Sequence, residues 1–160
     1  MISTVRTPSR AALLIASLLA CGPLSALAQS DSPPPTPTQL AGGKVASAEE
    51  IKQLVDKKSA LLIDTRSPLN YGKGHVPGAI SVAYGEKSAK AADFDAALDK
   101  FDMSKLPADK NANVVFYSDG PTGWKSYKGA VMAIKAGHKN VLYMRGGWAD
   151  WTAKGLPEAK

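Results

Sequence analysis

The sequence predicts an α/β fold in which a parallel sheet is covered by helices on both faces. Short apolar runs, each of the length of a buried strand, recur along the chain, and segments with helical spacing lie between them. Because strands that alternate with helices are joined by crossovers, we expect a parallel sheet buried on both sides. The expected strands cover 59–64, 80–82, 114–117 and 141–144.

Helical spacing of apolar residues occurs between these runs. Ser47 and Glu50 have the spacing of a capping box, which would begin the first helix. Gly137 and Gly155 are expected to end the last two helices. The apolar positions are Ile51, Leu54 and Val55 for the first helix, Phe94, Leu98 and Phe101 for the second, and Tyr127, Ala130, Val131 and Ile134 for the third, with a short fourth helix near 150–153.

The first 28 residues have the layout of a secretory signal. Arg6 and Arg10 precede the uncharged run 11–20, and the small residues of Ala26-Leu27-Ala28 offer a cleavage site. The apolar run is too short for a membrane span, and no polar face marks it as a buried helix. We therefore expect residues 1–28 to be a signal peptide and the protein to be periplasmic or secreted.

The signal segment also permits a second form of processing. Leu18-Leu19-Ala20-Cys21 resembles a bacterial lipobox, in which Cys21 would be lipidated and anchor the protein to a membrane. The apolar stretch continues past Cys21 to the cleavage site after Ala28. The soluble form is the favoured expectation, and the lipoprotein is the alternative.

Cleavage after Ala28 would leave 160 − 28 = 132 residues, a common size for one domain. Residues 29–43 are polar and rich in proline and glycine, which favours an extended linker without a binding role of its own. We expect residues 44–160 to form the folded domain.

The charge of the chain argues against nucleic-acid binding. The formal net charge is +6, and it becomes +4 when Arg6 and Arg10 are removed with the signal. The lysines are scattered along the sequence, whereas a nucleic-acid interface gathers them on one face. The charge favours solubility and a weak preference for anions.

Cys21 is the only cysteine of the sequence. It is either removed with the signal or blocked by lipid, so the processed protein would have no free thiol and no disulfide. Two histidines distant in sequence, without a thiol, do not make a metal site, and no cofactor is expected.

Three segments in order resemble the rhodanese family. Residues 62–67 (Leu-Ile-Asp-Thr-Arg-Ser) with 74–80 (Gly-His-Val-Pro-Gly-Ala-Ile) are similar to its first signature. Residues 140–148, with Trp151 and Gly155-Leu156-Pro157, are similar to its closing signature. The resemblance runs from about Ser47 to Pro157. It implies a single five-stranded α/β domain whose active-site loop bears a cysteine that carries sulfur as a persulfide, cradled by backbone N–H groups.

The expected active-site loop departs from the family at the nucleophile. Ser118 stands where the family places its catalytic cysteine, and Lys125-Ser126 falls where an Arg-Ser pair often begins the next helix. The loop resembles an exported subgroup with two cysteines followed by a tryptophan, and Ser118 and Gly123 occupy the two cysteine positions. A serine hydroxyl cannot form a persulfide, so this pattern predicts loss of sulfur transfer.

The loop keeps features that could bind an anion. A glycine-rich turn before a helix can direct several N–H donors at one ligand, with a lysine nearby. An empty, capped loop is the competing interpretation, because Pro121 lacks a donor and Asp119 would repel anions. Trp124 is either an exposed anchor for a partner or a plug for the vacated pocket. The candidate residues are Ser118, Asp119, Gly120, Pro121, Thr122, Gly123, Trp124, Lys125 and Ser126.

The leading hypothesis is an exported, non-catalytic rhodanese-like domain that binds a small oxyanion or an exported protein. One alternative is a sulfur-transfer pathway in which a partner supplies the thiol. Another is a serine hydrolase using Ser118, but the resemblance places neither His75 nor His138 beside it as a base. Structural roles are expected for Asp64 and Arg66 as a pair, for His75, and for Trp148 and Trp151 as packing residues.

Overall fold

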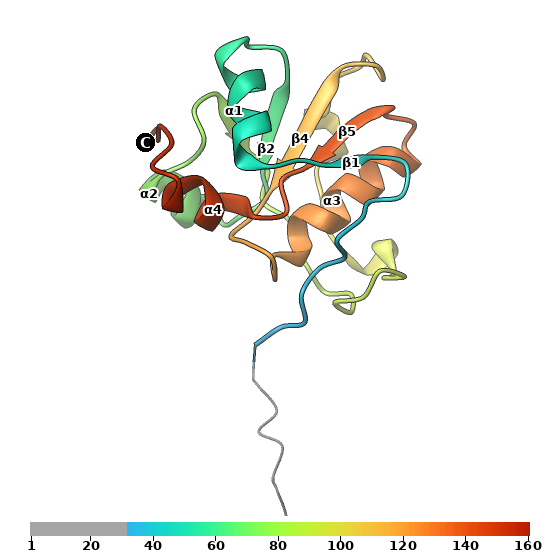
Figure 1. Cartoon of the computed structure of the whole chain (residues 1–160). Coiled ribbons are helices and arrows are strands. Elements are labelled where there is room, and N and C mark those ends of the chain that lie inside the picture. The colour runs from blue at the N-terminus through green and yellow to red at the C-terminus, as the bar shows by residue number, and fades with distance from the viewer. Residues whose placement is uncertain (1–31) are drawn as a thin grey trace, which may run out of the picture. The chain divides into compact units, whose positions relative to one another are not determined.

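Five parallel strands form the centre of the structure, which is a computed structural model that describes residues 32–160. The strand order across the sheet is β1-β5-β4-β2-β3, and every neighbouring pair is parallel (Figure 1). The single α/β domain with a five-stranded parallel sheet is therefore confirmed. The strands are β1 Lys44–Val45, β2 Leu61–Asp64, β3 Ala79–Ser81, β4 Asn113–Tyr117 and β5 Asn140–Tyr143.

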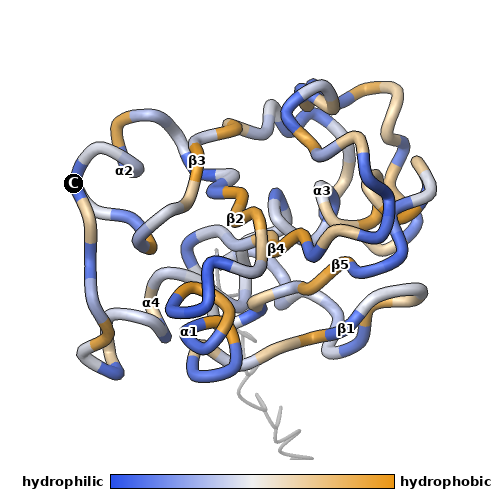
Figure 2. Tube along the Cα trace, turned by 90° about the horizontal axis from the view of Figure 1, so that it is seen from above, coloured by the Kyte–Doolittle hydropathy of each residue, from blue (hydrophilic) through white to orange (hydrophobic). Residues whose placement is uncertain are grey.

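Alternate residues of the strands face two separate apolar clusters. Val114 and Phe116 of β4 face one cluster, and Val115 and Tyr117 face the other. The first cluster is closed by α3 (Trp124–Lys135), and the second by α1 (Ala48–Asp56) and α4 (Gly147–Ala153). Helices thus cover both faces, as expected of a parallel sheet, and Figure 2 shows the hydrophobic residues gathered along β2, β4 and β5.

The ends of the helices follow local signals in the sequence. The capping box is present: the Ser47 hydroxyl accepts the Glu50 N–H at 3.2 Å, and the Glu50 carboxylate accepts the Ser47 N–H at 2.9 Å. Gly137 follows Ala136, the C-cap residue of α3, and has a positive φ of 93°. A further short helix, α2 (Pro68–Lys73), begins after Ser67, whose side chain accepts the Asn70 N–H.

The helix expected from Phe94, Leu98 and Phe101 is wrong. This part of the chain forms two separate 3₁₀ turns, η1 (Ala96–Leu98) and η2 (Met103–Lys105). The Asp95 and Asp102 carboxylates accept N–H groups two residues ahead, which favours short turns over a continuous helix. Phe94 and Phe101 still pack inward, whereas Leu98 is 54% exposed.

The expected linker also differs from a free spacer over its described part. Thr36 and Leu40 are both buried, and Leu40 belongs to the apolar cluster beneath α3. The prolines around Thr36 are largely exposed. The polar, proline-rich composition of the segment therefore gave no sign that Thr36 and Leu40 are buried. The expected signal peptide, residues 1–28 with Cys21, lies outside the described residues. Over 32–160, no helix has the length and apolar character needed to cross a membrane.

The segment between β3 and β4 is held by a buried lysine. Lys128 of α3 is fully buried, and its ammonium lies 2.8 Å from the Glu86 carboxylate and 2.8 Å from the Ser88 hydroxyl. It also lies 3.7 Å from Asp99. Burial alone would raise the pKa of Asp99, but hydrogen bonds from Ser88, Lys87 and Tyr84 outweigh it and hold this pKa below its usual range. A charged cluster therefore attaches the segment to α3.

We predict that Lys128→Met destabilises the fold, because it removes the buried positive charge that faces the Glu86 and Asp99 carboxylates. The expected loss is about 3 kcal/mol or more in the free energy of unfolding. Lys135→Met is the matched control, since Lys135 lies on the same helix but is exposed. Denaturant unfolding of both variants measures the difference, and equal stability would contradict a role for the charged cluster.

Candidate functional site

The loop between β4 and α3 lies at the carboxyl ends of the strands, where parallel α/β sheets carry their ligands. It runs over residues 118–123, and α3 begins directly afterwards at Trp124. Gly123 caps the helix without a side-chain hydrogen bond. The structure thus places all the candidate loop residues between the end of the central strand and the first turn of one helix.

Ser118 is buried at the start of this loop, with 2% of its surface exposed. Its carbonyl accepts the Trp148 N–H at 2.8 Å, and the Asp119 carbonyl accepts the Ala149 N–H at 2.9 Å. These two bonds fix the loop to the first turn of α4. Gly147 permits the contact, because it has a φ of 61° and a Cβ there would lie 2.5 Å from the Ser118 carbonyl oxygen.

The loop closes tightly over the Ser118 side chain. A Cβ built on Gly123 would lie 2.9 Å from the Ser118 Cβ and 2.9 Å from the Gly120 carbonyl oxygen. The Gly123 N–H donates to Gly120 at 2.8 Å, and the Trp124 N–H donates to Thr122 at 3.1 Å. With Pro121 lacking an N–H, the anion cradle has fewer free donors than its glycine content suggests.

Trp124 is buried, so it is not the exposed anchor that was one of its two expected roles. It retains 5% exposure and meets Tyr127 edge to face at a centroid distance of 5.6 Å. Its indole N–H donates to the Pro34 carbonyl at 2.7 Å. In the rest of the loop, Ser126 is buried and donates to Gly123, Lys125 is half-buried, and Asp119, Pro121 and Thr122 are exposed.

Residues 34–36, the strap, lie across this loop. The Thr36 N–H and hydroxyl donate to the Pro121 carbonyl at 2.8 and 2.9 Å. The Arg145 guanidinium donates to the Thr36 carbonyl at 3.1 and 3.0 Å, and the Tyr143 hydroxyl lies 2.7 Å from the Thr36 hydroxyl. Sequence reasoning missed this contact, since its partners stand more than 80 residues apart in the chain.

Asp64 and Arg66 form a buried ion pair below the loop. The Arg66 guanidinium lies 2.7 Å from the Asp64 carboxylate and donates to the Gly74 carbonyl at 2.6 Å. It also packs over the Trp148 ring at 4.8 Å. Burial would lower the pKa of Arg66, but the bond to Asp64 raises it overall, so the guanidinium stays charged. The pair connects the end of β2 to α4, and among the described residues no hydrogen bond joins it to Ser118.

Both histidines have partners away from Ser118. The His75 ring stacks on Tyr71 at 3.8 Å, and its Nδ1 lies 3.1 Å from the Tyr71 carbonyl oxygen. The His138 Nε2 pairs with the Lys110 ammonium at 3.0 Å. No hydrogen bond within residues 32–160 joins a histidine to Ser118. In the same residues, no three His, Cys, Asp or Glu side chains are grouped to hold a metal ion.

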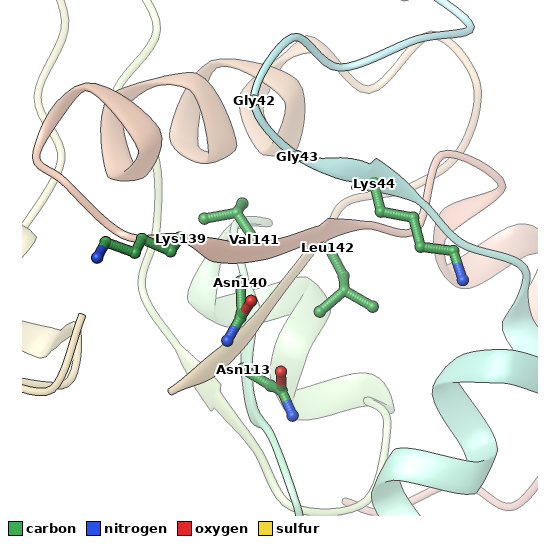
Figure 3. Close-up of a pocket in the computed structure, with 8 residues that line it drawn as sticks. All are labelled: Gly42, Gly43, Lys44, Asn113, Lys139, Asn140, Val141 and Leu142. Carbon is green, nitrogen blue, oxygen red and sulfur yellow. The ribbon is translucent and has the colours of Figure 1, made fainter. Parts of the chain in front are cut away.

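A cavity of about 340 Å³ lies at the opposite, amino-terminal end of the strands (Figure 3). Its lining comes from Gly42 to Lys44 and from the starts of β4 and β5. Figure 3 shows the Lys44 and Lys139 side chains pointing away from one another, and Lys44 is paired with Glu50. Its lining does not include the loop of residues 118–123, so this cavity is separate from the candidate site.

Comparison with known proteins agrees with this geometry. A family model described as a rhodanese-like domain matches residues 47–154. A sulfurtransferase from Allochromatium vinosum is 29% identical over 106 residues, which cover 66% of this chain and 84% of that protein. A thiosulfate sulfurtransferase structure from Pseudomonas aeruginosa superposes with a TM-score of 0.53 at 24% identity, covering 74% of this chain and 20% of that one.

A second group of relatives is larger than this chain. The tRNA uridine(34) hydroxylase of Yersinia enterocolitica is 29% identical over 122 residues, or 72% of this chain. The chain spans only 31% of the length of that enzyme. The similarity therefore concerns one part of the hydroxylase.

We predict that Gly123→Ala destabilises the protein by roughly 1–3 kcal/mol, because the added Cβ would press on Ser118 and on the Gly120 carbonyl. Gly120→Ala is the matched control in the same loop, since its Cβ would meet other atoms no closer than 3.7 Å. Thermal or denaturant unfolding compares the two variants. Equal losses would show that the loop is less crowded than the structure indicates.

We also predict a loss of stability in mild acid that depends on His138. Burial, and then the Lys110 charge, lower the pKa of His138 from its ordinary 6.5. The folded protein binds this proton less readily than the unfolded chain does. The contribution of His138 to the free energy of unfolding is therefore fully present above the unfolded pKa. It is lost as the pH falls toward the folded pKa. The free energy of unfolding should decline from about pH 7.5 to about pH 5.5 less steeply in His138→Gln than in the wild type. An identical pH dependence of the free energy of unfolding in the two proteins would refute the role of His138.

Proposed function

The chain belongs to the rhodanese-like domain family, and we propose that this member is an exported, non-catalytic domain that binds a protein partner. The relation to sulfurtransferases is established by the family match and by the similarity to the Allochromatium enzyme. The absence of catalysis, the export and the partner are the proposed parts. Export rests on the signal-like residues 1–28.

The observation that carries the proposal is the buried Ser118 at the nucleophile position. Sulfur transfer of the rhodanese type requires a thiolate that takes a sulfane sulfur and holds it through an S–S bond. Ser118 has only a hydroxyl, and Cys21, the one cysteine of the sequence, lies in the expected signal segment. No described residue supplies the thiol.

The surroundings of Ser118 also argue against a different reaction at the same position. A serine nucleophile needs a base within hydrogen-bond reach and an approach for substrate. Ser118 is 2% exposed, and the two histidines bond to Tyr71 and Lys110. The hydrolase alternative therefore lacks a histidine base beside its nucleophile.

A protein partner fits the loop better than a small oxyanion. Two loop N–H groups are already bonded, Pro121 has none, and Asp119 presents an exposed carboxylate that repels anions. Leu69, on α2 after β2, adds an apolar side chain that is 70% exposed at the same end of the sheet. Exposed apolar and polar side chains at one pole of a domain are typical of protein-binding surfaces.

The proposal predicts no transfer of sulfur from thiosulfate to cyanide. Wild type and Ser118→Ala, both carrying Cys21→Ser to remove the remaining thiol, should give the same thiocyanate signal as a blank. An active thiosulfate sulfurtransferase serves as the positive control. Intact-mass measurement after incubation with thiosulfate should find no added sulfur atom on either protein.

A rate above the blank that is lost in Ser118→Ala would overturn the non-catalytic role. Ser118→Cys is the more informative gain-of-function variant, since a second cysteine at Gly123 would meet the close contacts described above. Hydrolysis of an activated ester is measured in parallel, and equal values for wild type and Ser118→Ala are expected.

A further inference from the structure

The strap has the character of a bound ligand. We propose that the groove formed by Pro121, Trp124, Tyr143 and Arg145 is a recognition site for an extended, proline-flanked threonine segment of a partner protein, and that the strap fills this site within its own chain. This inference rests on the proposed binding function and names the chemistry of the partner.

Thr36 is the anchor of the bound segment. Its exposed fraction is 2%, whereas the prolines at 33–35 are exposed. Its single hydroxyl hydrogen goes to the Pro121 carbonyl, so the Tyr143 hydroxyl donates to the Thr36 oxygen. Its N–H also reaches Pro121. Every polar group of this residue is thus satisfied by the groove.

The groove also binds two main-chain carbonyls of the strap, one before the threonine and one of the threonine itself. Trp124 donates to the Pro34 carbonyl, and Arg145 donates twice to the Thr36 carbonyl. The fixed φ of the flanking prolines favours an extended chain, and such a chain can present both carbonyls to these donors. The ligand chemistry is therefore a threonine with a free N–H, held extended by prolines.

The floor of the groove is aromatic. Trp124, Tyr127 and Tyr143 form a chain of edge-to-face contacts with centroid distances of 5.6 and 5.8 Å. Grooves that recognise proline-rich segments combine aromatic side chains with a donor to a ligand carbonyl. The strap site has both elements, and both come from residues outside the strap.

The strap can leave without unfolding the domain. Its contacts depend on one buried residue, and Leu40 provides a separate anchor four residues later. Residues 38 and 39 between them are exposed. Local opening of such a segment costs far less than global unfolding. A partner segment of the same chemistry competes with a tethered copy, so binding in trans strengthens when the strap is weakened.

The test uses the full chain with Thr36→Pro. This change keeps the segment extended but removes the N–H and the hydroxyl that bond to Pro121. Thr38→Pro is the matched control, since Thr38 is exposed and also follows a proline. The readout is hydrogen exchange of the Trp124 indole N–H, assigned among the three tryptophans with Trp124→Phe. Exchange should be at least about tenfold faster in Thr36→Pro than in the wild type or Thr38→Pro.

The second arm adds a synthetic peptide of residues 31–40. It should bind Thr36→Pro and restore slow indole exchange, bind the wild type about tenfold more weakly, and fail to bind when Arg145→Ala is added. A peptide carrying proline in place of the threonine should not bind.

Three outcomes would overturn the inference: unchanged indole exchange in Thr36→Pro, no protection by the peptide, or concentration-dependent dimers in which copies exchange straps. The sulfur-transfer assay is independent of all three, so a failure here leaves the non-catalytic role intact.

Discussion

Two hydrogen bonds from the first turn of α4 to the loop after β4 hold the carboxyl end of the sheet together. The Trp148 and Ala149 N–H groups meet the carbonyls of Ser118 and Asp119, which brings the turn after β5 against the loop after β4. Gly147 makes this approach possible through its positive φ. The Arg66 guanidinium packs over the Trp148 ring, and its ion-pair partner Asp64 is the last residue of β2. Three neighbouring strands are thereby tied at one pole.

This arrangement does not depend on the chemistry of the side chain at position 118. The main-chain bonds at Ser118 use its carbonyl and not its side chain, so they do not depend on whether the position carries sulfur or oxygen. In the proposed non-catalytic role, the missing thiol removes the chemistry and leaves the scaffold in place. Donors and aromatic side chains remain at this pole, and three of these residues, Trp124, Tyr143 and Arg145, bond to the strap.

The sequence predicted the layers of the fold well, because strand and helix periodicities are local properties. The capping box at Ser47 and the stop at Gly137 are equally local, and both are found. The failed helix around Leu98 has a local cause too, since Asp95 and Asp102 compete for the backbone N–H groups. The position of the loop came from a family resemblance. The burial of Lys128 and Thr36 could not be predicted from the sequence, because the residues that they bond to lie far away in the chain.

Contacts made by residues before and after the family match show that the folded domain extends beyond that match. The family match covers 47–154, yet Thr36 and Leu40 precede it, while Pro157 accepts the Trp151 indole N–H and Ala159 pairs with His75 beyond it. A polypeptide trimmed to the family limits would uncover the aromatic floor at one end and the Trp151 indole at the other. Freshly uncovered apolar surface of this kind promotes aggregation. Boundaries for expression are therefore better taken from these contacts than from the extent of sequence similarity.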